Sequence, residues 1–323
     1  MITNDLFNRV LIKPAEKGCN KLRIISGYAT PAMAFHHLNT LKNIGAKVNV
    51  ELIVGMTSQD GLSKSNHRGF QQLVNEDFKN SFYCSYFVKT PPVHSKVYVW
   101  FKNDMPLFAF TGSANYTQTA FSNQQELMVE CSAENLSEYY KSLISDTIYC
   151  NHIDAENFVT IYNDQTYKRL QRQKKLLEDK EIPPDFVLQG LPQIRVSLLD
   201  NSGSLPKRSG LNWGQRPEYD RDPNQAYIRL PSTVYRSDFF PAVGVHFTVY
   251  TDDDKVLICT RAQANGKAIH TPHNNSLIGQ YFRRRLGLRS GQFIRKEDLN
   301  RYGRTHLDFY KIDNETYYMD FSK

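Results

Sequence analysis

Five polar residues between positions 94 and 126 have the types and the spacing that phosphoryl transfer requires: His94, Lys96, Ser113, Asn115 and Glu126. An imidazole can attack a phosphorus atom, and a carboxylate can hold the far nitrogen of that imidazole. A lysine ammonium and amide N–H groups can stabilise charge on the non-bridging phosphate oxygens. None of these steps requires a metal ion. We therefore predict a phosphoryl-transfer site with these five catalytic residues and no metal ligand.

Secondary structure must bring these residues together, and their spacing indicates how. If His94 and Lys96 lie on a strand, both side chains project to the same face because side chains alternate. Ser113 and Asn115 follow the next predicted strand and share a direction if the extended path continues. Gly112 has no Cβ and therefore allows a ligand to approach the backbone. Glu126, the acidic residue of the five, opens a third predicted strand.

Each part of this pattern also has a plainer explanation. His94 alone could be an ordinary strand histidine, and residues 112–115 alone could be a turn. Their order along the chain, with Glu126 following, favours the catalytic interpretation. His36 and His37 lie in a helical pattern, so we expect them to be packing or surface residues.

Residues 21–132 alternate between strand and helix patterns, and an amphipathic helix follows. Apolar runs predict strands at 21–29, 48–56, 82–88, 96–101, 107–110 and 126–131. Helical patterns lie at Pro31–Ile44, His67–Phe78 and Glu134–Ile148, and Thr30 before Pro31 is a helix-start signature. This alternation indicates an α/β layer structure with a largely buried sheet.

The pattern changes after residue 163. A segment dense in charge, 168–181, precedes two prolines and predicts a solvated helix or a linker. Short β-type runs at 193–199, 226–230, 245–251, 256–260 and 306–313, with one helix at Ser276–Leu286, then indicate a small barrel or sandwich. We place two domains at 1–165 and 187–323, joined by a charged linker at 166–186.

Basic residues are distributed differently in the two halves. The net charge is +7, from 40 Lys and Arg against 33 Asp and Glu, which is compatible with a polyanion partner. Residues 1–180 contain 15 Lys and 5 Arg, whereas residues 181–323 contain 6 Lys and 14 Arg. Because arginine suits bidentate recognition of phosphates and guanine edges, the second half is the better candidate for reading nucleic acid.

The predicted catalytic residues carry a family resemblance. The HSK run at 94–96 followed by GSAN at 112–115 resembles the half-motif of the phospholipase D superfamily, whose histidine forms a phosphohistidine intermediate. The general pattern has an acid five residues after the lysine, but this chain has Phe101 there, and Asp104 is off register. With Glu126 downstream, the set is similar to that of BfiI-like and NgoFVII-type restriction endonucleases.

The resemblance implies a fold and a role for each residue. We expect an α/β phospholipase D-like nuclease domain, with a mixed sheet and helices on both faces. His94 would be the nucleophile, and Glu126 would orient it. Lys96 and Asn115 would bind the scissile phosphate, with assistance from Ser113. Since the chemistry uses two histidines and the chain has a single His-x-Lys, we expect a homodimer that brings two copies of the histidine together across a two-fold axis.

Two polar, arginine-rich segments of the second half combine amides, hydroxyls and an aromatic ring, groups that clamp phosphates and contact base edges. In their β-rich context they resemble the mainly-β, B3-like DNA-recognition pseudobarrel of the same endonucleases, which grips DNA with two arms. The resemblance implies an N-terminal arm at Lys207–Arg221 and a C-terminal arm at Pro272–Arg285. Within them we predict DNA contacts by Lys207, Arg208, Asn212, Trp213, Gln215, Arg216, Asn274, Asn275, Ser276, Gln280, Arg283 and Arg284. Trp213 and Phe282 could equally be core residues.

The leading interpretation is a sequence-specific, type II-like restriction endonuclease that acts on double-stranded DNA. The alternatives are a phospholipase D-type lipid phosphodiesterase and a non-catalytic dimeric DNA-binding protein. We expect no cofactor in this chain, which lacks a Gly-x-x-x-x-Gly-Lys-Ser/Thr motif. Any ATP requirement would be met by a separate ATPase subunit. A restriction function also implies a cognate methyltransferase as a partner.

Cysteine usage and hydropathy indicate where the protein works. Its cysteines are odd in number and widely spaced, which favours a reducing compartment over a disulfide framework: Cys19, Cys84, Cys131, Cys150 and Cys259. The N-terminal residues do not read as a secretion signal, and no apolar run approaches the roughly 20 residues that span a bilayer. We expect a soluble cytoplasmic protein that does not engage a membrane.

Overall fold

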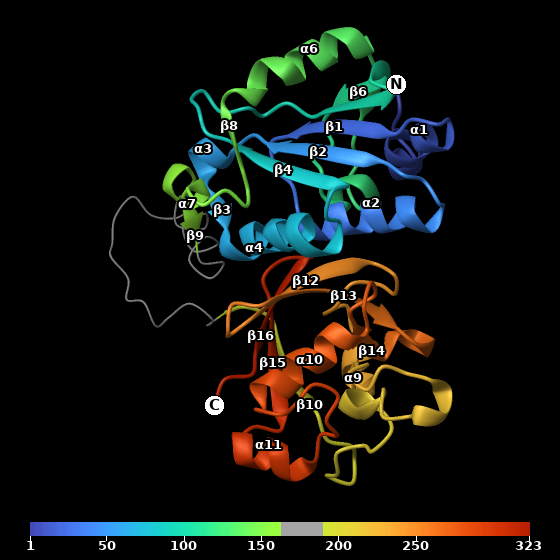
Figure 1. Ribbon diagram of the computed structural model, residues 1–323, viewed down its shortest axis with the longest axis vertical. Coiled ribbons are helices and arrows are strands. Elements are labelled where there is room, and N and C mark those ends of the chain that lie inside the picture. Colours follow the sequence, from blue (N-terminus) through green and yellow to red (C-terminus); the bar gives the residue numbers. More distant parts are fainter. Residues whose placement is uncertain (163–189) are drawn as a thin grey trace. The chain divides into compact units, whose positions relative to one another are not determined.

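The computed structural model describes residues 1–162 and 190–323 (Figure 1). The chain divides into two compact units, Met1–Glu178 and Asp179–Lys323. The predicted linker at 166–186 lies outside the described residues, and so do the two domain boundaries beside it. The two units are therefore described separately.

The first unit is built on a seven-stranded mixed sheet with the strand order β7-β6-β5-β1-β2-β4-β8. β1, β2 and β4 are parallel to one another, and the other neighbouring strands pair antiparallel. The strands are β1 Lys21–Ser26, β2 Asn49–Val54, β4 Phe82–Phe87, β5 Val97–Lys102, β6 Met105–Gly112, β7 Met128–Glu130 and β8 Thr147–Tyr149.

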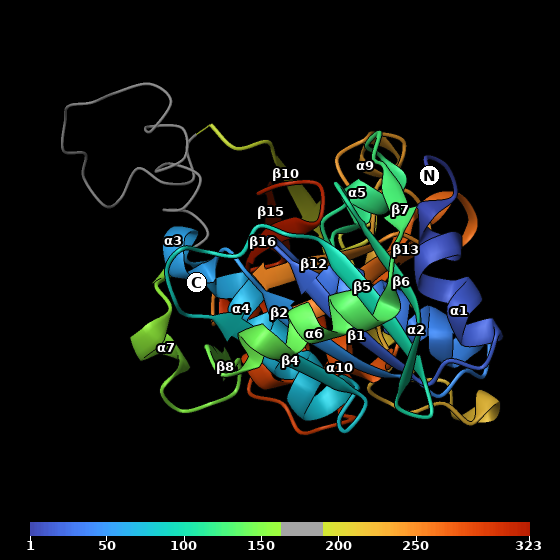
Figure 2. The same cartoon turned by 90° about the horizontal axis from the view of Figure 1, so that it is seen from above.

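Helices cover both faces of this sheet. α2 (Pro31–Asn43) and α4 (Lys64–Gln72) lie on one face, and α6 (Ala133–Ile144) packs across β1, β5 and β6 on the other (Figures 1 and 2). The predicted α/β layer architecture is thus confirmed. The shorter elements are a π-helix at Phe7–Ile12, α1 Lys13–Glu16, α3 Thr57–Asp60, β3 Leu62–Ser63, a π-helix at Leu73–Asp77, α5 Gln118–Ser122, α7 Ala155–Phe158 and β9 Ile161–Tyr162.

The ends of several elements differ from the sequence prediction. The helix predicted at 134–148 ends at Ile144, and the chain then turns back as β8, which pairs with β4 and forms an edge of the sheet. The strand predicted at 126–131 is only three residues long, so Glu126 precedes β7 instead of opening it. The helix start predicted at Thr30 is correct, because its side chain accepts a hydrogen bond from Met33 N at 3.3 Å.

The second unit is mainly β, as predicted. Its seven strands have the order β10-β15-β16-β12-β13-β14-β11, and only the β12–β16 pair is parallel. The strands are β10 Gln193–Ser197, β11 Ile228–Arg229, β12 His246–Thr251, β13 Val256–Ala262, β14 Ala268–His270, β15 His306–Lys311 and β16 Thr316–Asp320. The helices are α9 Ser232–Tyr235, α10 Ser276–Arg285 and α11 Lys296–Tyr302. Of these helices only α10 was predicted.

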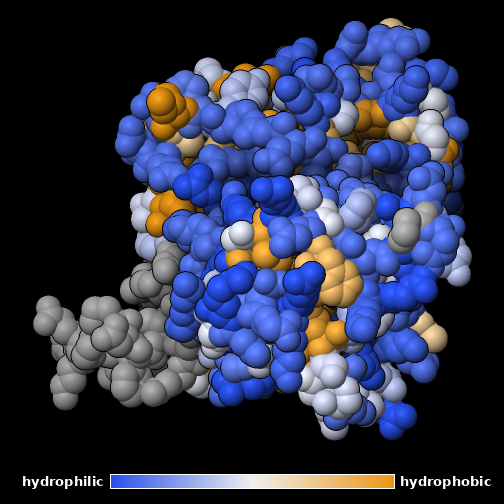
Figure 3. Space-filling model, turned by 60° about the horizontal axis from the view of Figure 1, so that its bottom comes forward, coloured by the Kyte–Doolittle hydropathy of each residue, from blue (hydrophilic) through white to orange (hydrophobic). Residues whose placement is uncertain are grey.

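The surface and the thiols also bear on the sequence analysis. Within residues 1–162 and 190–323, no helix has the length and apolar character needed to cross a membrane. The face shown in Figure 3 is mostly hydrophilic, with apolar residues in small groups. All five cysteines are free, and Cys131 alone among them is exposed.

Candidate active site and DNA-binding arms

Strand ends from separate parts of the sequence meet at one end of the first unit's sheet. Ile25 of β1 pairs with Val97 of β5, and Val97 pairs with Thr111 of β6. Thr111 in turn pairs with Val129 of β7. The five predicted catalytic residues lie beyond this row: two before β5, two after β6 and one before β7. Antiparallel pairing therefore brings three separate segments to one edge.

The His94 imidazole is exposed at this edge and packs against the turn that follows β1. Its ring centroid lies 5.9 Å from that of Tyr28, in an edge-on arrangement. A Cβ at position 27 would lie 2.8 Å from Cδ2 of His94, so Gly27 leaves room for the imidazole. Within the part of the chain that the structure describes, the imidazole has no hydrogen-bond partner. Both ring nitrogens are therefore available.

Lys96 is a buried cation next to the backbone of His94. The side chain is largely buried, with the whole residue 7 % exposed, and Nζ donates a hydrogen bond to His94 O at 2.7 Å. Burial lowers the pKa of the Lys96 ammonium, and the nearby charge of Glu126 opposes this shift. One of the three ammonium protons is used by His94 O, so two remain for an anion.

The carboxamide of Asn115 is oriented by the end of β1. Its Oδ1 accepts a hydrogen bond from Tyr28 N at 3.1 Å and lies 3.4 Å from Ser26 Oγ. Ser26 is fully buried, accepts from Tyr116 N at 2.8 Å and donates to Tyr28 O at 2.6 Å. Because the oxygen is held by the turn after β1, the Nδ2 group of Asn115 is left as a donor with no partner among the described residues.

Ser113 and Glu126 pair with each other. The Ser113 hydroxyl donates to the Glu126 carboxylate and accepts from Leu127 N at 3.0 Å. The two segments approach closely at this point, since a Cβ at Gly112 would lie 2.0 Å from Leu127 O. In the described residues, the Glu126 carboxylate makes its hydrogen bond to Ser113 and none to His94. Within a single subunit, the role of orienting His94 that was expected for Glu126 is therefore not supported by a direct contact between the two described side chains.

The turn that follows β1 contributes to the site in a way that was not predicted. Ser26, Gly27 and Tyr28 contact Asn115 or His94, and the Tyr28 hydroxyl donates to Asp60 Oδ2 at 2.5 Å. A glycine directly after a buried strand was the available signal, because a loop glycine often marks a close approach.

The buried His37 packs against the segment that carries Asn115. His37 Nδ1 lies 2.8 Å from Tyr116 OH, and Nε2 lies 3.0 Å from Leu11 O. Burial lowers the pKa of His37 to about 3, so the ring is neutral near pH 7. His37 is thus a packing residue, in agreement with the sequence analysis. Among the described residues, no three His, Cys, Asp or Glu side chains are grouped to hold a metal ion.

The N-terminal arm, Lys207–Arg221, contains exposed and buried candidates. Lys207 and Arg208 are exposed, whereas Asn212 is fully buried. Asn212 Nδ2 donates to the carbonyls of Pro206 at 3.1 Å and Ile294 at 2.8 Å, and its Oδ1 accepts from Ile294 N at 3.0 Å. Because the whole amide is used inside the fold, we withdraw Asn212 from the predicted DNA contacts.

The predicted contacts Gln215, Asn274, Asn275 and Ser276 also form hydrogen bonds within the domain. Gln215 Nε2 donates to Pro223 O at 3.0 Å and Gly291 O at 2.9 Å. The other three predicted contacts of this group shape the helix start: Asn274 Oδ1 accepts from Ser276 N at 2.9 Å, Asn275 Oδ1 lies 2.7 Å from His270 Nδ1, and Ser276 Oγ donates to Asp222 Oδ2 at 2.7 Å. Trp213 and Arg216 are half-buried, and Asn274 and Gln280 are exposed.

Arg283 is a structural residue of the C-terminal arm. It is 1 % exposed and donates to the carbonyls of Gly279 at 3.2 Å, Pro223 at 3.0 Å and Gln292 at 2.7 Å. Burial lowers the pKa of its guanidinium to about 10, and nearby Asp222 opposes the shift. The predicted DNA contact by Arg283 is therefore withdrawn, because its donors serve three backbone segments.

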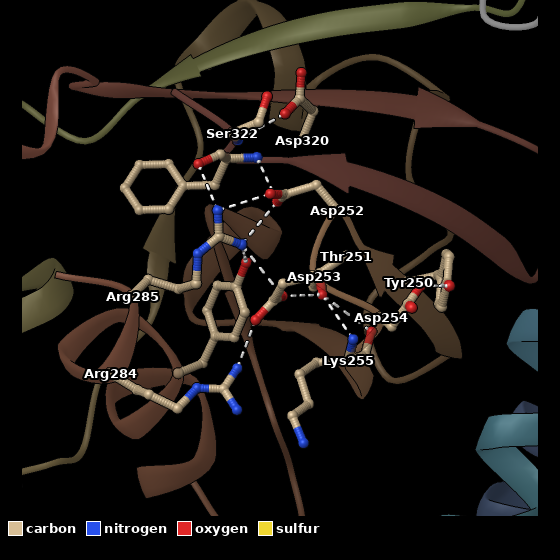
Figure 4. A network of polar contacts seen from close by, with 12 residues as sticks. Tyr250, Thr251, Asp252, Asp253, Asp254, Lys255, Arg284, Arg285, Asp320 and Ser322 are labelled. Carbon is tan, nitrogen blue, oxygen red and sulfur yellow. Dashed lines mark hydrogen bonds and ion pairs between the residues drawn. The ribbon is translucent and has the colours of Figure 1, made fainter. Parts of the chain in front are cut away.

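Arg284 and Arg285, which follow Arg283, are held by an acidic turn between β12 and β13 that contains Asp252 and Asp253. Arg284 Nη2 lies 2.6 Å from Asp253 Oδ2, and Arg285 forms two bonds to Asp252, at 2.9 and 2.7 Å (Figure 4). Arg285 Nη2 also donates to Phe321 O at 2.9 Å. Arg284 remains exposed on its outer side, whereas Arg285 is a fold-stabilising residue.

Comparison with known proteins identifies the family. The NgoFVII restriction endonuclease N-terminal PLD domain matches residues 4–157, and the NgoFVII C-terminal B3-like DNA-binding domain matches residues 186–313. The chain belongs to the NgoFVII restriction endonuclease family. Its two units are thus a phospholipase D-like nuclease domain and a B3-like DNA-binding domain, as the resemblance implied.

Solved structures are also similar to part of this NgoFVII-family chain. NucT from Helicobacter pylori is 18% identical, with 46% of this chain and 96% of that chain covered and a TM-score of 0.32. The phospholipase D family member Nuc from Salmonella typhimurium is 14% identical, covers 44% and 89%, and has a TM-score of 0.28. Phosphatidylserine synthase from Haemophilus influenzae Rd KW20 is 15% identical, covers 51% and 42%, and has a TM-score of 0.34. No curated protein matches the chain.

Membership of the NgoFVII family fixes the domain types and makes DNA the partner of the second domain. The match identifies no catalytic residue, so the roles of the five active-site residues stay predictions. The structure brings all five to one sheet edge. Two of the twelve predicted DNA contacts, Asn212 and Arg283, are buried and bonded within the fold. The other ten stay predictions.

Proposed function

We propose that this chain is a type II-like restriction endonuclease that hydrolyses double-stranded DNA at a specific sequence by a metal-independent phosphohistidine mechanism. The site would be completed by a second copy of the chain. The observation that carries the proposal is the arrangement of three groups at one end of the sheet: the imidazole of His94 and the Nδ2 of Asn115, neither of which has a hydrogen-bond partner among the described residues, and the buried ammonium of Lys96.

The reaction would proceed in two displacements on phosphorus. In the first, a ring nitrogen of His94 forms a bond to phosphorus while the bond to the leaving oxygen breaks. The second copy of His94 gives that oxygen a proton. In the second displacement, water attacks the phosphohistidine and passes its proton to the histidine that acted as acid. The histidine nucleophile is released, and the atoms and protons balance.

Lys96 and Asn115 would hold the phosphate through both steps. The Lys96 ammonium is desolvated, which strengthens its attraction for an anion, and its backbone bond to His94 O keeps it next to the nucleophile. Asn115 cannot turn its oxygen toward the phosphate without losing the bond from Tyr28 N. Ser113 and Glu126 would assist from the facing segment, where they hold each other.

The test measures hydrolysis in EDTA on plasmid DNA and on bis(p-nitrophenyl) phosphate, a small diester that needs no recognition sequence. We expect hydrolysis by the unchanged chain and its loss in His94→Ala, whereas the exposed His152→Ala serves as a matched control that retains activity. A phosphohistidine intermediate would be trapped by denaturation as a base-stable, acid-labile link between labelled DNA and the chain.

Two partners belong to the proposal and define how a negative result is interpreted. A separate ATPase subunit would supply any ATP-dependent step, and a cognate methyltransferase would protect the host DNA. Cutting of the plasmid only after an ATPase subunit is added would support the first of these. DNA binding with no hydrolysis of either substrate, with or without that subunit, would favour the non-catalytic alternative.

A further inference from the structure

Most arginines of the two arms already have partners in the second unit. Arg208 forms an ion pair with Glu218, and Arg216 donates to Arg208 O at 2.9 and 2.5 Å. The C-terminal arginines are bound to backbone carbonyls or to the acidic turn of Figure 4. A guanidinium with its donors occupied has to break a bond before it can contact DNA, so these residues are poor candidates for base reading.

Arg221, at the end of the N-terminal arm, differs from them. Its guanidinium carbon lies 4.2 Å from the ring centroid of Trp213 and 5.2 Å from that of Tyr219. Within the described residues it makes no hydrogen bond or ion pair. Its Nη1 is buried and has no partner in residues 1–162 and 190–323. The flat side of this guanidinium thus packs against aromatic rings, while no described residue accepts a hydrogen bond from it.

The surrounding backbone holds this group in place. Trp213 packs edge-on against Tyr227, with 6.0 Å between the ring centroids. Gly214 N donates to Gln225 O at 2.7 Å, and a Cβ at Gly214 would lie 2.2 Å from Asp222 O. The chain segments before and after Arg221 are therefore held close to each other. A guanidinium fixed in this way loses little conformational freedom on binding.

We propose that Arg221 is a specificity-determining residue that reads a guanine through bidentate hydrogen bonds to O6 and N7. The proposal rests on the DNA-binding function of this domain. A guanidinium fork matches these two acceptors. Nη1 is the only donor of Arg221 that is buried without a partner in the described residues, so Nε and Nη2 are the pair that would make the two bonds. Lys207, which is exposed and unpaired in the described residues, has instead the character of a phosphate contact.

The test selects binding sites from a random-sequence duplex pool with the full chain and its variants. The unchanged chain should select a consensus, and Arg221→Lys should lose the preference for guanine at one position. Affinity for the consensus should fall by roughly 5- to 150-fold, as for the loss of one bidentate base contact. The slope of log affinity against log salt should not change, because the charge is retained.

Three further measurements separate base reading from other roles. Replacement of that guanine by 7-deazaguanine should weaken the unchanged chain and leave Arg221→Lys unaffected. Tyr219→Ala removes an aromatic partner that is 62 % exposed, so the fold should tolerate it while the same guanine preference weakens. Lys207→Gln is the matched control: it should keep the consensus and reduce the salt slope by about 1.

The outcomes are distinct. If Arg221→Lys retains every base preference, the inference is overturned. If Arg221→Gln behaves as Lys207→Gln is expected to, with a uniform loss and a lower salt slope, Arg221 is a phosphate contact and the inference is again overturned. If the unchanged chain selects no sequence at all, the proposed sequence-specific function fails, and the inference fails with it.

Discussion

Two asparagines show how hydrogen bonding decides which residues can act on a substrate. Asn212 donates and accepts only within the backbone of its own domain, so its amide stabilises a loop. Asn115 uses its oxygen in the same manner, through Tyr28 N, but its Nδ2 group has no partner in the part of the chain that the structure describes. The same side chain is therefore structural at one position and a candidate oxyanion donor at the other.

Asn115→Asp tests this distinction. The variant keeps an oxygen for Tyr28 N and replaces the free donor by a negative oxygen beside the phosphate. We expect hydrolysis of bis(p-nitrophenyl) phosphate to fall by roughly 100- to 1,000-fold, the usual cost of losing one such donor. The melting temperature should change little. Asn123→Asp makes the same change at an exposed position, and an equal loss of rate there would contradict the assignment.

At the scale of elements, the site depends on how closely strand ends approach one another. Gly27 follows β1 and borders the His94 side chain, whereas Gly112 ends β6 and borders the Leu127 backbone. Both glycines lie at close approaches, but their neighbours differ in freedom. A side chain can rotate away from an added methyl group, and a paired backbone cannot.

Alanine substitutions at these two glycines should therefore have different effects. Gly27→Ala should displace the imidazole and reduce hydrolysis at least tenfold, with the melting temperature nearly preserved, because the 2.8 Å contact is to a side chain. Gly112→Ala should reduce activity and lower the melting temperature together, because its 2.0 Å contact is to Leu127 O. Thermal unfolding and hydrolysis measured on both variants check this, and equal melting temperatures would speak against it.

The buried His37 links α2, the N-terminal π-helix and the segment that carries Asn115, and it predicts a pH dependence. Its pKa is lowered to about 3 by burial, whereas a histidine in the unfolded chain titrates near 6.5. Below that value the unfolded state binds the proton and the folded state does not. Its contribution to stability is therefore complete above pH 6.5 and is lost as the pH falls toward 3.

Urea unfolding of the nuclease domain in the full chain measures this effect. Between pH 7 and pH 5 the free energy of unfolding should fall by about 2 kcal/mol from this residue alone. His37→Gln should be less stable at pH 7 and should show a flatter pH dependence. His152→Gln changes an exposed histidine and should leave the pH dependence unaltered. An unchanged slope in His37→Gln would rule the explanation out.

At the scale of the whole molecule, the sequence predicted the layers, and which polar residues would lie near one another, better than the connections. Alternating strand and helix patterns predicted the sheet of the nuclease domain, and the HSK and GSAN runs lie together at one end of it. β8, β14 and β16 were missed because they take their conformation from pairing with a neighbouring strand, and β8 and β14 are only three residues long. The role of the β1 turn was missed for a related reason: Gly27 meets His94 only after the sheet has formed.

The same limit explains the two withdrawn DNA contacts. Residue type identified Asn212 and Arg283 as groups that bind DNA, and type alone cannot tell whether a donor already has a partner. Both lie fully buried and satisfy backbone groups that are distant in sequence, Ile294 in one case and Pro223 in the other. Such partners are created by tertiary packing, so no local pattern reports them.

The single His-x-Lys makes one further prediction for the assembled molecule. If each active site needs His94 from two chains, a mixed dimer with one His94→Ala subunit lacks either the nucleophile or the acid. In a fully exchanged equal mixture of unchanged and His94→Ala chains, only about one quarter of the dimers then keep both histidines, so activity should fall to about one quarter. Dilution of the unchanged chain with buffer to the same concentration gives the value for independent sites, about one half. Light scattering on the same samples should give a mass twice the 37.4 kDa of one chain. A residual activity of one half, or a fully active species with the mass of a single chain, would show that one subunit carries a complete site and that its acid must be sought among the chain's own residues.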